Sequence, residues 1–253
     1  MVNELVTVER VAAVGRIELN RADVSNAIDL PTAHALGAAV DTVAADPEVR
    51  AVVLTGAGPR FCVGGDVASM AAAEDQASYV HELAEAIDGT LQRLAALEKP
   101  VVIGVHGAVA GGGMALMLSG DLVVAGASTR FVTAYAGVGL TPDCGLSWLL
   151  PRAVGHQRAA ELCLTGRVLT AADAEVWGMV TRVTDDRAVV ADAVALGEQL
   201  AAGPAYAFGQ AHRLLHNAWT FSRGEAGAEE SRTISQAVTT PDAQQRINAF
   251  LKH

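Results

Sequence analysis

Two glycine clusters are the residues of this chain whose type and spacing best suit chemistry. Gly64 and Gly65 lie in FCVGGDVASM, and Gly111, Gly112 and Gly113 lie in HGAVAGGGMAL; each cluster follows a β-branched run. Glycine destabilises a helix interior by about 0.8–1.0 kcal/mol relative to alanine. Three glycines at a predicted helix start therefore indicate that the backbone there must be free of side chains, so that another group can approach it. The first N–H groups of a helix have no partner within it and can bind an oxyanion. Tight turns and close packing are the alternative role for either cluster alone.

Other kinds of site fit the sequence less well. GAGPRFCVGG lacks the Gly-Lys-Ser/Thr ending of a P-loop, and GGGMAL lacks the third glycine of a dinucleotide fingerprint. His212 and His216 have the spacing of two ligands on one helix face, but no neighbouring acid completes a zinc signature, so we expect surface histidines and no metal. The three cysteines are scattered without ligand spacing, and we expect Cys62 and Cys144 to pack in the interior.

The elements that must position the glycines alternate between strand and helix. LVTVER and VAAVGRIELN predict a hairpin, and AVVLTGAG, KPVVIGVHG and DLVVAGA predict buried strands. LPTAHALGAAVDTVAADPEV and SYVHELAEAIDGTLQRLAAL predict helices, the first with Pro31 in its first turn. Strands separated by helices favour an α/β body with parallel pairing.

From about Leu169 the pattern becomes mostly helical, with MVTRVT as one brief strand. We therefore expect an α/β core over residues 1–195 and a helical C-terminal region over residues 196–253. No long linker separates them, so the division near residue 195 is predicted as a structural subdivision of one folding unit.

Composition limits the partners and the compartment. The chain has 253 residues and a formal net charge of −10, which disfavours nucleic acid and anionic membrane surfaces as partners. The apolar window 101–120 contains His106 and six glycines, so a buried strand followed by a helix is expected there rather than a membrane span. MVNELVTVER lacks the apolar region of a signal peptide, and we expect a cytoplasmic protein.

Five motifs, in order along nearly the whole chain, resemble the crotonase superfamily, the enoyl-CoA hydratase/isomerase family. They are LNRADVSNAI (19–28), VVLTGAGPRFCVGGDVASM (52–70), KPVVIGVHGAVAGGGMALMLSGDLVVA (99–125), RFVTAYAGVGLTPDCGLSWLLPRAVG (130–155) and LTAADAEVWGMVTRV (169–183). The resemblance implies a crotonase-like spiral of ββα repeats with a helical C-terminal trimerisation region. It also implies homotrimers or dimers of trimers, and acyl-coenzyme A thioester substrates with no cofactor beyond their coenzyme A moiety.

The same resemblance assigns roles to individual positions. The family's two oxyanion-hole donors match the backbone N–H groups of Gly65 and Gly112, which would hold the thioester oxygen as it gains negative charge on the way to an enolate. Coenzyme A contacts, made largely by main chain, match Val24, Ala27, Val63, Gly65, Asp66 and Val67. Asp66 has an alternative role, because a loop aspartate often caps neighbouring N–H groups.

One departure from the family decides between reactions. The two glutamates with which the family's hydratases activate water match Ala115 and Tyr135, and neither is a carboxylate. Asp143 matches the proton-transferring aspartate of the phenylacetate-pathway epoxyphenylacetyl-CoA and enoyl-CoA isomerase branch, which its segment resembles most. We therefore expect an enoyl-CoA isomerase with Asp143 as acid and base. The alternatives are an enoyl-CoA hydratase and a non-catalytic acyl-CoA-binding subunit, and Asp143 also suits a helix N-cap.

Overall fold

Six strands form the main sheet of the computed structural model, which describes residues 4–252. Residues 1–3 of the predicted core and residue 253 of the predicted C-terminal region lie outside this description. The strand order is β1-β2-β3-β4-β6-β9: β1 and β2 form the predicted antiparallel hairpin, and the later neighbours pair in parallel. The bounds are Val6–Val11 (β1), Val14–Leu19 (β2), Ala51–Gly56 (β3), Val101–Val105 (β4), Leu122–Gly126 (β6) and Arg182–Thr184 (β9).

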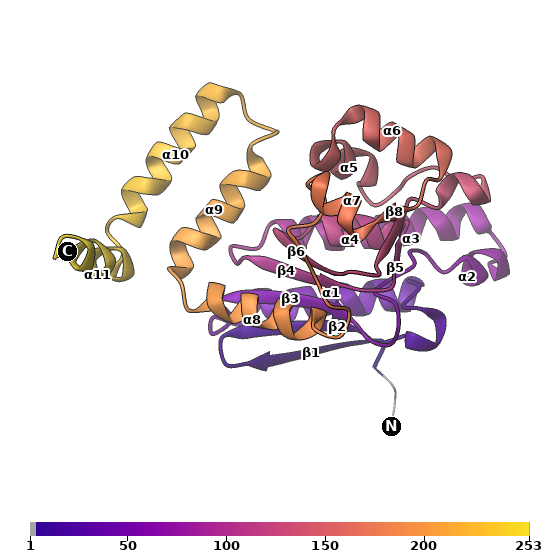
Figure 1. Cartoon of the computed structure of the whole chain (residues 1–253), viewed down its shortest axis with the longest axis horizontal. Helices are drawn as coiled ribbons and strands as arrows, with labels where there is room; N and C mark the ends of the chain where they lie inside the picture. Colours follow the sequence, from indigo (N-terminus) through magenta and orange to yellow (C-terminus); the bar gives the residue numbers. More distant parts are fainter. Residues whose placement is uncertain (1–3, 253) are drawn as a thin grey trace.

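Hydrophobic layers cover both faces of the main sheet. Val52 and Leu54 of β3 pack in a core with α1 (Leu30–Ala45) and α3 (Gln76–Ala95), whereas Val53 packs with α8 (Val189–Ala201). Successive side chains of a strand point to opposite faces, so two covered faces leave every residue of β3 buried. Figure 1 shows α8 lying along the sheet beside β3.

A second sheet, ordered β5-β7-β8, gives the fold its repeat. Each of two main-sheet strands is followed by a short strand of the second sheet and then by a helix: β4, β5 and α4 make one such unit, and β6, β7 and α5 make the next. This is the ββα pattern that the resemblance implies, and the predicted α/β class with a helical C-terminal region is confirmed. The bounds are Ala108–Ala110 (β5), Gly112–Leu118 (α4), Arg130–Val132 (β7), Leu146–Val154 (α5) and Leu169–Thr170 (β8), with α2 at Val67–Ala72, α6 at His156–Thr165, α7 at Ala171–Val176 and short 3-10 turns at Ala22–Val24 (η1) and Tyr135–Val138 (η2).

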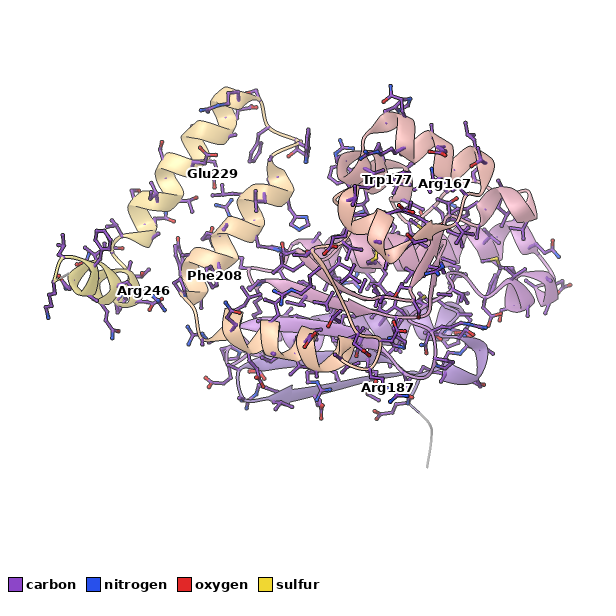
Figure 2. All side chains as sticks on the ribbon, viewed as in Figure 1. Arg167, Trp177, Arg187, Phe208, Glu229 and Arg246 are labelled. Carbon is purple, nitrogen blue, oxygen red and sulfur yellow. The ribbon has the colours of Figure 1, made fainter. Side chains whose placement is uncertain are left out.

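The last helices form an arm beyond the core. α9 (Ala205–Asn217), α10 (Arg223–Ala237) and α11 (Pro241–Phe250) follow α8, and Figure 1 shows α10 and α11 set apart from both sheets. The division predicted near residue 195 falls inside α8, which covers the main sheet, so the arm begins after that helix. Glu229 of α10, labelled in Figure 2, forms a 2.7 Å ion pair with Arg213 of α9.

The apolar window 101–120 contains the predicted strand (β4) and helix (α4), with the short strand β5, which was not predicted, between them. Between residues 4 and 252, no helix is both long enough and apolar enough to cross a membrane.

Candidate active site

The two glycine clusters lie against each other. Cys62 and Val109 form a parallel β-bridge, and the Ala110 N–H donates to the Cys62 carbonyl oxygen at 3.0 Å, which aligns the loop after β3 with the end of β5. Gly64 has a φ of +91°, and a Cβ placed there would lie 3.0 Å from the Gly112 nitrogen. Glycine is therefore required at position 64 both by the backbone conformation and by the close approach of the second loop.

Two backbone N–H groups of these loops are unpaired and line one cavity. Gly65 and Gly112 both line a cavity of about 230 Å³, and neither N–H has a hydrogen-bond acceptor among residues 4–252. Gly112 is the first residue of α4, where an N–H has no partner within the helix. Beside Gly65, the bridge to Ile28 uses the Gly64 carbonyl and the Asp66 N–H. Both donors are therefore available to an oxyanion in this cavity.

Asp143 lines the same cavity and is held by Tyr135. The Tyr135 hydroxyl donates to Asp143 Oδ1 at 2.5 Å. Burial, followed by the charge of Asp143, raises the pKa of Tyr135 well above its usual range, so the phenol remains a hydrogen-bond donor. The structure thus pairs the predicted acid and base, Asp143, with Tyr135, a residue that the sequence analysis left without a catalytic role. Asp143 is also the only carboxylate among the described residues that line this cavity.

The side chain of Asp143 does not cap a helix, so that local alternative is wrong. α5 begins at Leu146 with Gly145 as its N-cap, and no side chain accepts a hydrogen bond from its first turn. Cys144 and Gly145 have φ values of +51° and +73°, and this left-handed turn lies between the aspartate and the helix. Only the main-chain oxygen of Asp143 accepts the Leu146 N–H, at 2.9 Å. The carboxylate is consequently left for the cavity.

The two cysteines nearest the cavity are buried, as predicted, and are poor nucleophiles. Burial raises the pKa of Cys62 to about 12. Burial, followed by the charge of Asp143, raises the pKa of Cys144 well above its usual range. Because the thiolate is the reactive form, both groups serve packing at neutral pH.

The positions predicted to contact coenzyme A divide into two groups. Val63 and Val67 line the cavity with Gly65, whereas Val24 in η1 and the buried Ala27 do not. For all of these positions, main-chain contact with coenzyme A remains a prediction. Their places in the fold put Val63, Gly65 and Val67 at the cavity wall and Val24 on the surface.

Asp66 has the capping role that the sequence left open. One of its oxygens accepts the N–H groups of Ala68 and Ser69, at 3.1 and 3.2 Å, and so caps α2. The other lies 3.2 Å from the guanidinium of Arg21. Both carboxylate oxygens therefore hold the loop that carries Gly65.

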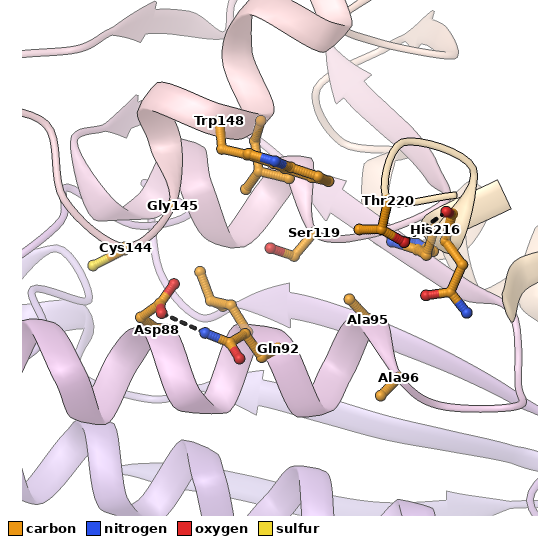
Figure 3. A pocket seen from close by; sticks show the side chains of 13 residues that line it. Asp88, Gln92, Ala95, Ala96, Ser119, Cys144, Gly145, Trp148, His216 and Thr220 are labelled. Atoms are coloured by element: carbon orange, nitrogen blue, oxygen red, sulfur yellow. Dashed lines mark hydrogen bonds between the residues drawn. The ribbon is translucent and has the colours of Figure 1, made fainter. Parts of the chain in front are cut away.

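A second cavity, of about 480 Å³, adjoins the first at Cys144, which lines both. Figure 3 shows Asp88 and Gln92 of α3 on one wall, joined by a 2.6 Å hydrogen bond, and Trp148 of α5 on another. His216 of α9 also faces this space. No motif predicts this cavity, because its walls come from helices far apart in the chain.

The expectation that both paired histidines lie on the surface is wrong for His212, which is 3% exposed. Its Nδ1 lies 2.7 and 2.8 Å from the two carboxylate oxygens of Asp121. Asp121 is 91 residues from His212 in the sequence, so a search for a local metal-binding motif does not find this acid.

Ala115, at the position of one hydratase glutamate, is fully buried in α4.

Comparisons with known proteins find a matching family, similar sequences and similar structures. A sequence model of the family described as enoyl-CoA hydratase/isomerase matches residues 9–253. A 1,2-epoxyphenylacetyl-CoA isomerase of Escherichia coli is 35% identical over 93% of this chain and 90% of the relative. A trans-2-decenoyl-acyl-carrier-protein isomerase of Streptococcus mutans is 36% identical over 68% of this chain and 66% of the relative. The crystal structure of an enoyl-CoA hydratase from Mycobacterium smegmatis superposes with a TM-score of 0.92 at 31% identity, covering 98% of this chain and 96% of the other.

Proposed function

Because the chain belongs to the enoyl-CoA hydratase/isomerase family, we propose that it is an enoyl-CoA isomerase in which Asp143 is both base and acid. The observation that carries the proposal is the pairing of one carboxylate with a protonated phenol in a cavity that also contains two unpaired backbone donors. Relatives bear both isomerase and hydratase names, so the choice between these reactions depends on the chemistry of this cavity.

The proposed reaction moves one double bond by two proton transfers. The Asp143 carboxylate removes a proton from carbon 2 of a 3-enoyl thioester, and the electron pair of that C–H bond enters an enolate. The N–H groups of Gly65 and Gly112 hold the enolate oxygen, which gains charge only as the reaction proceeds. The protonated Asp143 then returns the proton to carbon 4, and the product is the 2-enoyl thioester. No water and no other reactant is consumed.

Tyr135 acts as a positioning residue in this scheme. Its hydroxyl donates to Asp143 Oδ1 and so holds the carboxylate at the wall of the cavity. A phenol that stays protonated also donates to the carboxylate before the proton is taken up. Tyr135 thereby fixes the orientation of the base, and positioning of this kind lowers the barrier to proton transfer.

Hydration fits the cavity less well than isomerisation. Adding water to a 2-enoyl thioester requires a group that takes a proton from water and a group that gives one to carbon 2. The positions of the two family glutamates are an alanine and a tyrosine, and Asp143 is the single carboxylate that the described lining offers. The neighbouring cavity gives room for the distal part of the acyl group beyond Asp143.

The direct test is product analysis with paired 2-enoyl- and 3-enoyl-CoA substrates of short and long chain. Proton NMR and mass spectrometry of the wild-type products should show interconversion of the two enoyl isomers with no change in mass. A 3-hydroxyacyl product, heavier by one water, would instead identify a hydratase. Binding of the thioester in calorimetry with no product from any substrate would identify a non-catalytic acyl-CoA-binding subunit.

The assembly is also part of the proposal: a cytoplasmic homotrimer or dimer of trimers, joined through the C-terminal arm. Apolar side chains are strongly exposed on the arm, including Leu215 (69%), Ile234 (70%) and Phe250 (80%). Such a surface favours contact with a second copy of the chain. Light scattering on the full chain should give three or six times the chain mass of 26.1 kDa, and a monomer would contradict this assembly.

A further inference from the structure

Asp121, His212 and His216 form a second polar cluster. Asp121 lies between α4 and β6, and the two histidines lie one turn apart on α9. One ligand atom from each residue lies within 4.8 Å of the other two. None of the three lines the cavity that contains Asp143; His216 borders the neighbouring cavity, but no step of the reaction proposed above uses any of the three side chains.

The hydrogen bonds of His212 fix the position of its ring proton. Its Nε2 lies 2.9 Å from the Ala95 carbonyl oxygen, which can only accept, so Nε2 carries a hydrogen. In a neutral ring Nδ1 is then a bare lone pair, 2.7 Å from Asp121 Oδ1. Two acceptors at this separation require a hydrogen or a metal ion between them. A proton shared by Nδ1 and the carboxylate, or a metal ion, meets this requirement.

His216 distinguishes these two arrangements. Its Nε2 lies 3.6 Å from the same oxygen of Asp121, which is too long for a hydrogen bond. A proton on His212 joins only that ring to Asp121, with His216 beside them at a ring-centroid distance of 4.4 Å, whereas a metal ion would engage both rings and the carboxylate directly. The bond from His212 Nε2 to Ala95, and a 2.7 Å bond from the Val101 N–H to Asp121 Oδ2, orient two of the donors as outer-shell partners do at metal sites.

We propose that Asp121, His212 and His216 bind a divalent transition-metal ion of the zinc class, which fastens α9 to the core. Two imidazoles and one carboxylate are a donor set that such ions use. Ligand atoms around a tetrahedral zinc ion lie roughly 3.3 Å apart, so the contacts of His212 with Asp121 must lengthen by roughly half an ångström. A fourth ligand, such as water, can approach from the surface hollow that Asp121 and His216 line.

Calorimetric titration of the untagged full chain with ZnCl₂, after removal of metal by a chelator, tests the site. We expect saturable binding of one zinc ion per chain and a rise in Tm that the chelator reverses. His216→Gln removes a half-buried ligand whose loss leaves the core packing intact, and it should weaken zinc binding at least about 100-fold. His34→Gln is the matched control, because His34 is an exposed histidine of α1 and its loss should leave binding unchanged.

Cobalt(II) provides an independent readout. Binding at the cluster should give visible absorption bands that are lost in His216→Gln and retained in His34→Gln, with circular dichroism used to verify that both variants are folded. Absence of saturable zinc binding by the wild type, or equal binding by His216→Gln, would overturn the proposal. The cluster would then be an ion pair bridged by a proton.

Discussion

Asp143 and Asp121 are two partly buried carboxylates whose surroundings prepare them for different tasks. Asp143 lines the cavity, accepts a hydrogen bond from the Tyr135 hydroxyl and interacts with the neighbouring Cys144 thiol. Asp121 accepts the Val101 N–H and lies in contact with Nδ1 of His212 through both oxygens. The comparison shows that a carboxylate at a cavity wall can meet a substrate, whereas a carboxylate enclosed by a backbone N–H and two histidines serves a structural role.

The same contrast holds for the segments around the two acids. Asp143 lies on a left-handed turn between η2 and α5, where Cys144 and Gly145 direct the chain away from helical capping. Asp121 follows the last turn of α4 and joins the core to the first helix of the arm. One acid therefore serves the cavity, and the other serves the attachment of α9.

The largest effect is expected from Asp143→Asn, which keeps the shape of the side chain and the bond from Tyr135 but removes the base. Isomerase kcat should fall about 10²–10⁴-fold, because general acid and base catalysis contributes this much. Binding of the acyl-CoA, followed by calorimetry, should persist. Asp41→Asn alters an acid on the surface of α1 and should retain wild-type turnover. Retained turnover in Asp143→Asn would remove Asp143 from the mechanism.

For the other acid the expected effect is on stability. Asp121→Ala leaves the buried His212 and the Val101 N–H without their partner, and in the metal-free protein it should lower the free energy of unfolding by about 3–5 kcal/mol. Urea unfolding followed by circular dichroism measures this loss. Asp41→Ala, which breaks a surface ion pair, should cost less than about 1 kcal/mol. Equal losses for Asp121→Ala and Asp41→Ala would contradict the structural role of Asp121.

Gly112→Pro removes one backbone donor while keeping a residue that helices accept at their first position. Loss of an oxyanion donor should lower kcat about 10²–10³-fold. Gly112→Ala is the matched control, because it keeps the N–H and its Cβ would meet no atom closer than 3.7 Å. If the alanine and proline variants lose activity equally, the N–H is not the active feature of this position.

Tyr135→Phe keeps the ring and removes the hydroxyl that holds Asp143. We expect kcat to fall about tenfold with little change in KM, since one hydrogen bond to a charged group is lost. Tyr206→Phe also removes a phenol hydrogen bond, to Gln236 on the arm, and should have no such effect. An unchanged kcat in Tyr135→Phe would show that Asp143 is positioned without it.

Cys144→Ala should have the smallest effect. Burial, followed by the charge of Asp143, raises the pKa of the Cys144 thiol, so the thiol stays neutral between about pH 6 and 9 and adds no limb to the pH profile. The profile of kcat/KM for the alanine variant should therefore follow that of the wild type over this range. Loss of a limb in the variant would indicate that the thiol ionises near the substrate.

The sequence predicts the elements that long periodic stretches specify. The β1–β2 hairpin, the buried strands and the long helices α1 and α3 were all expected, because their patterns repeat over enough residues to be read. The strands β5, β7 and β8, of two or three residues each, were not predicted, whereas the equally short β9 was expected from the alternating residues of MVTRVT. At Gly107, with a φ of +63°, a Cβ would lie 2.1 Å from the Pro59 oxygen. The turn at Gly107 therefore ends β4 and separates it from β5. The packing that requires this turn comes from a loop distant in the sequence.

The candidate site divides in the same way. The sequence motifs identify Gly65, Gly112 and Asp143 as candidate site residues, and all three line one cavity in the structure. The bond from Tyr135 to Asp143 and the contact of His212 with Asp121 depend on where turns and helices meet in space. Local sequence patterns do not predict contacts between distant segments, and for His212 they predicted an exposed side chain that is in fact buried.

The most direct test of the central claim is hydrogen exchange at carbon 2 of a 3-enoyl-CoA in D₂O, followed by proton NMR with wild-type enzyme and with Asp143→Asn. Wild-type enzyme should incorporate deuterium at carbon 2 and shift the double bond, because both events pass through the enolate. The asparagine variant should bind the thioester and do neither. Exchange that continues in the variant, or a double-bond shift that proceeds without Asp143, would contradict the account.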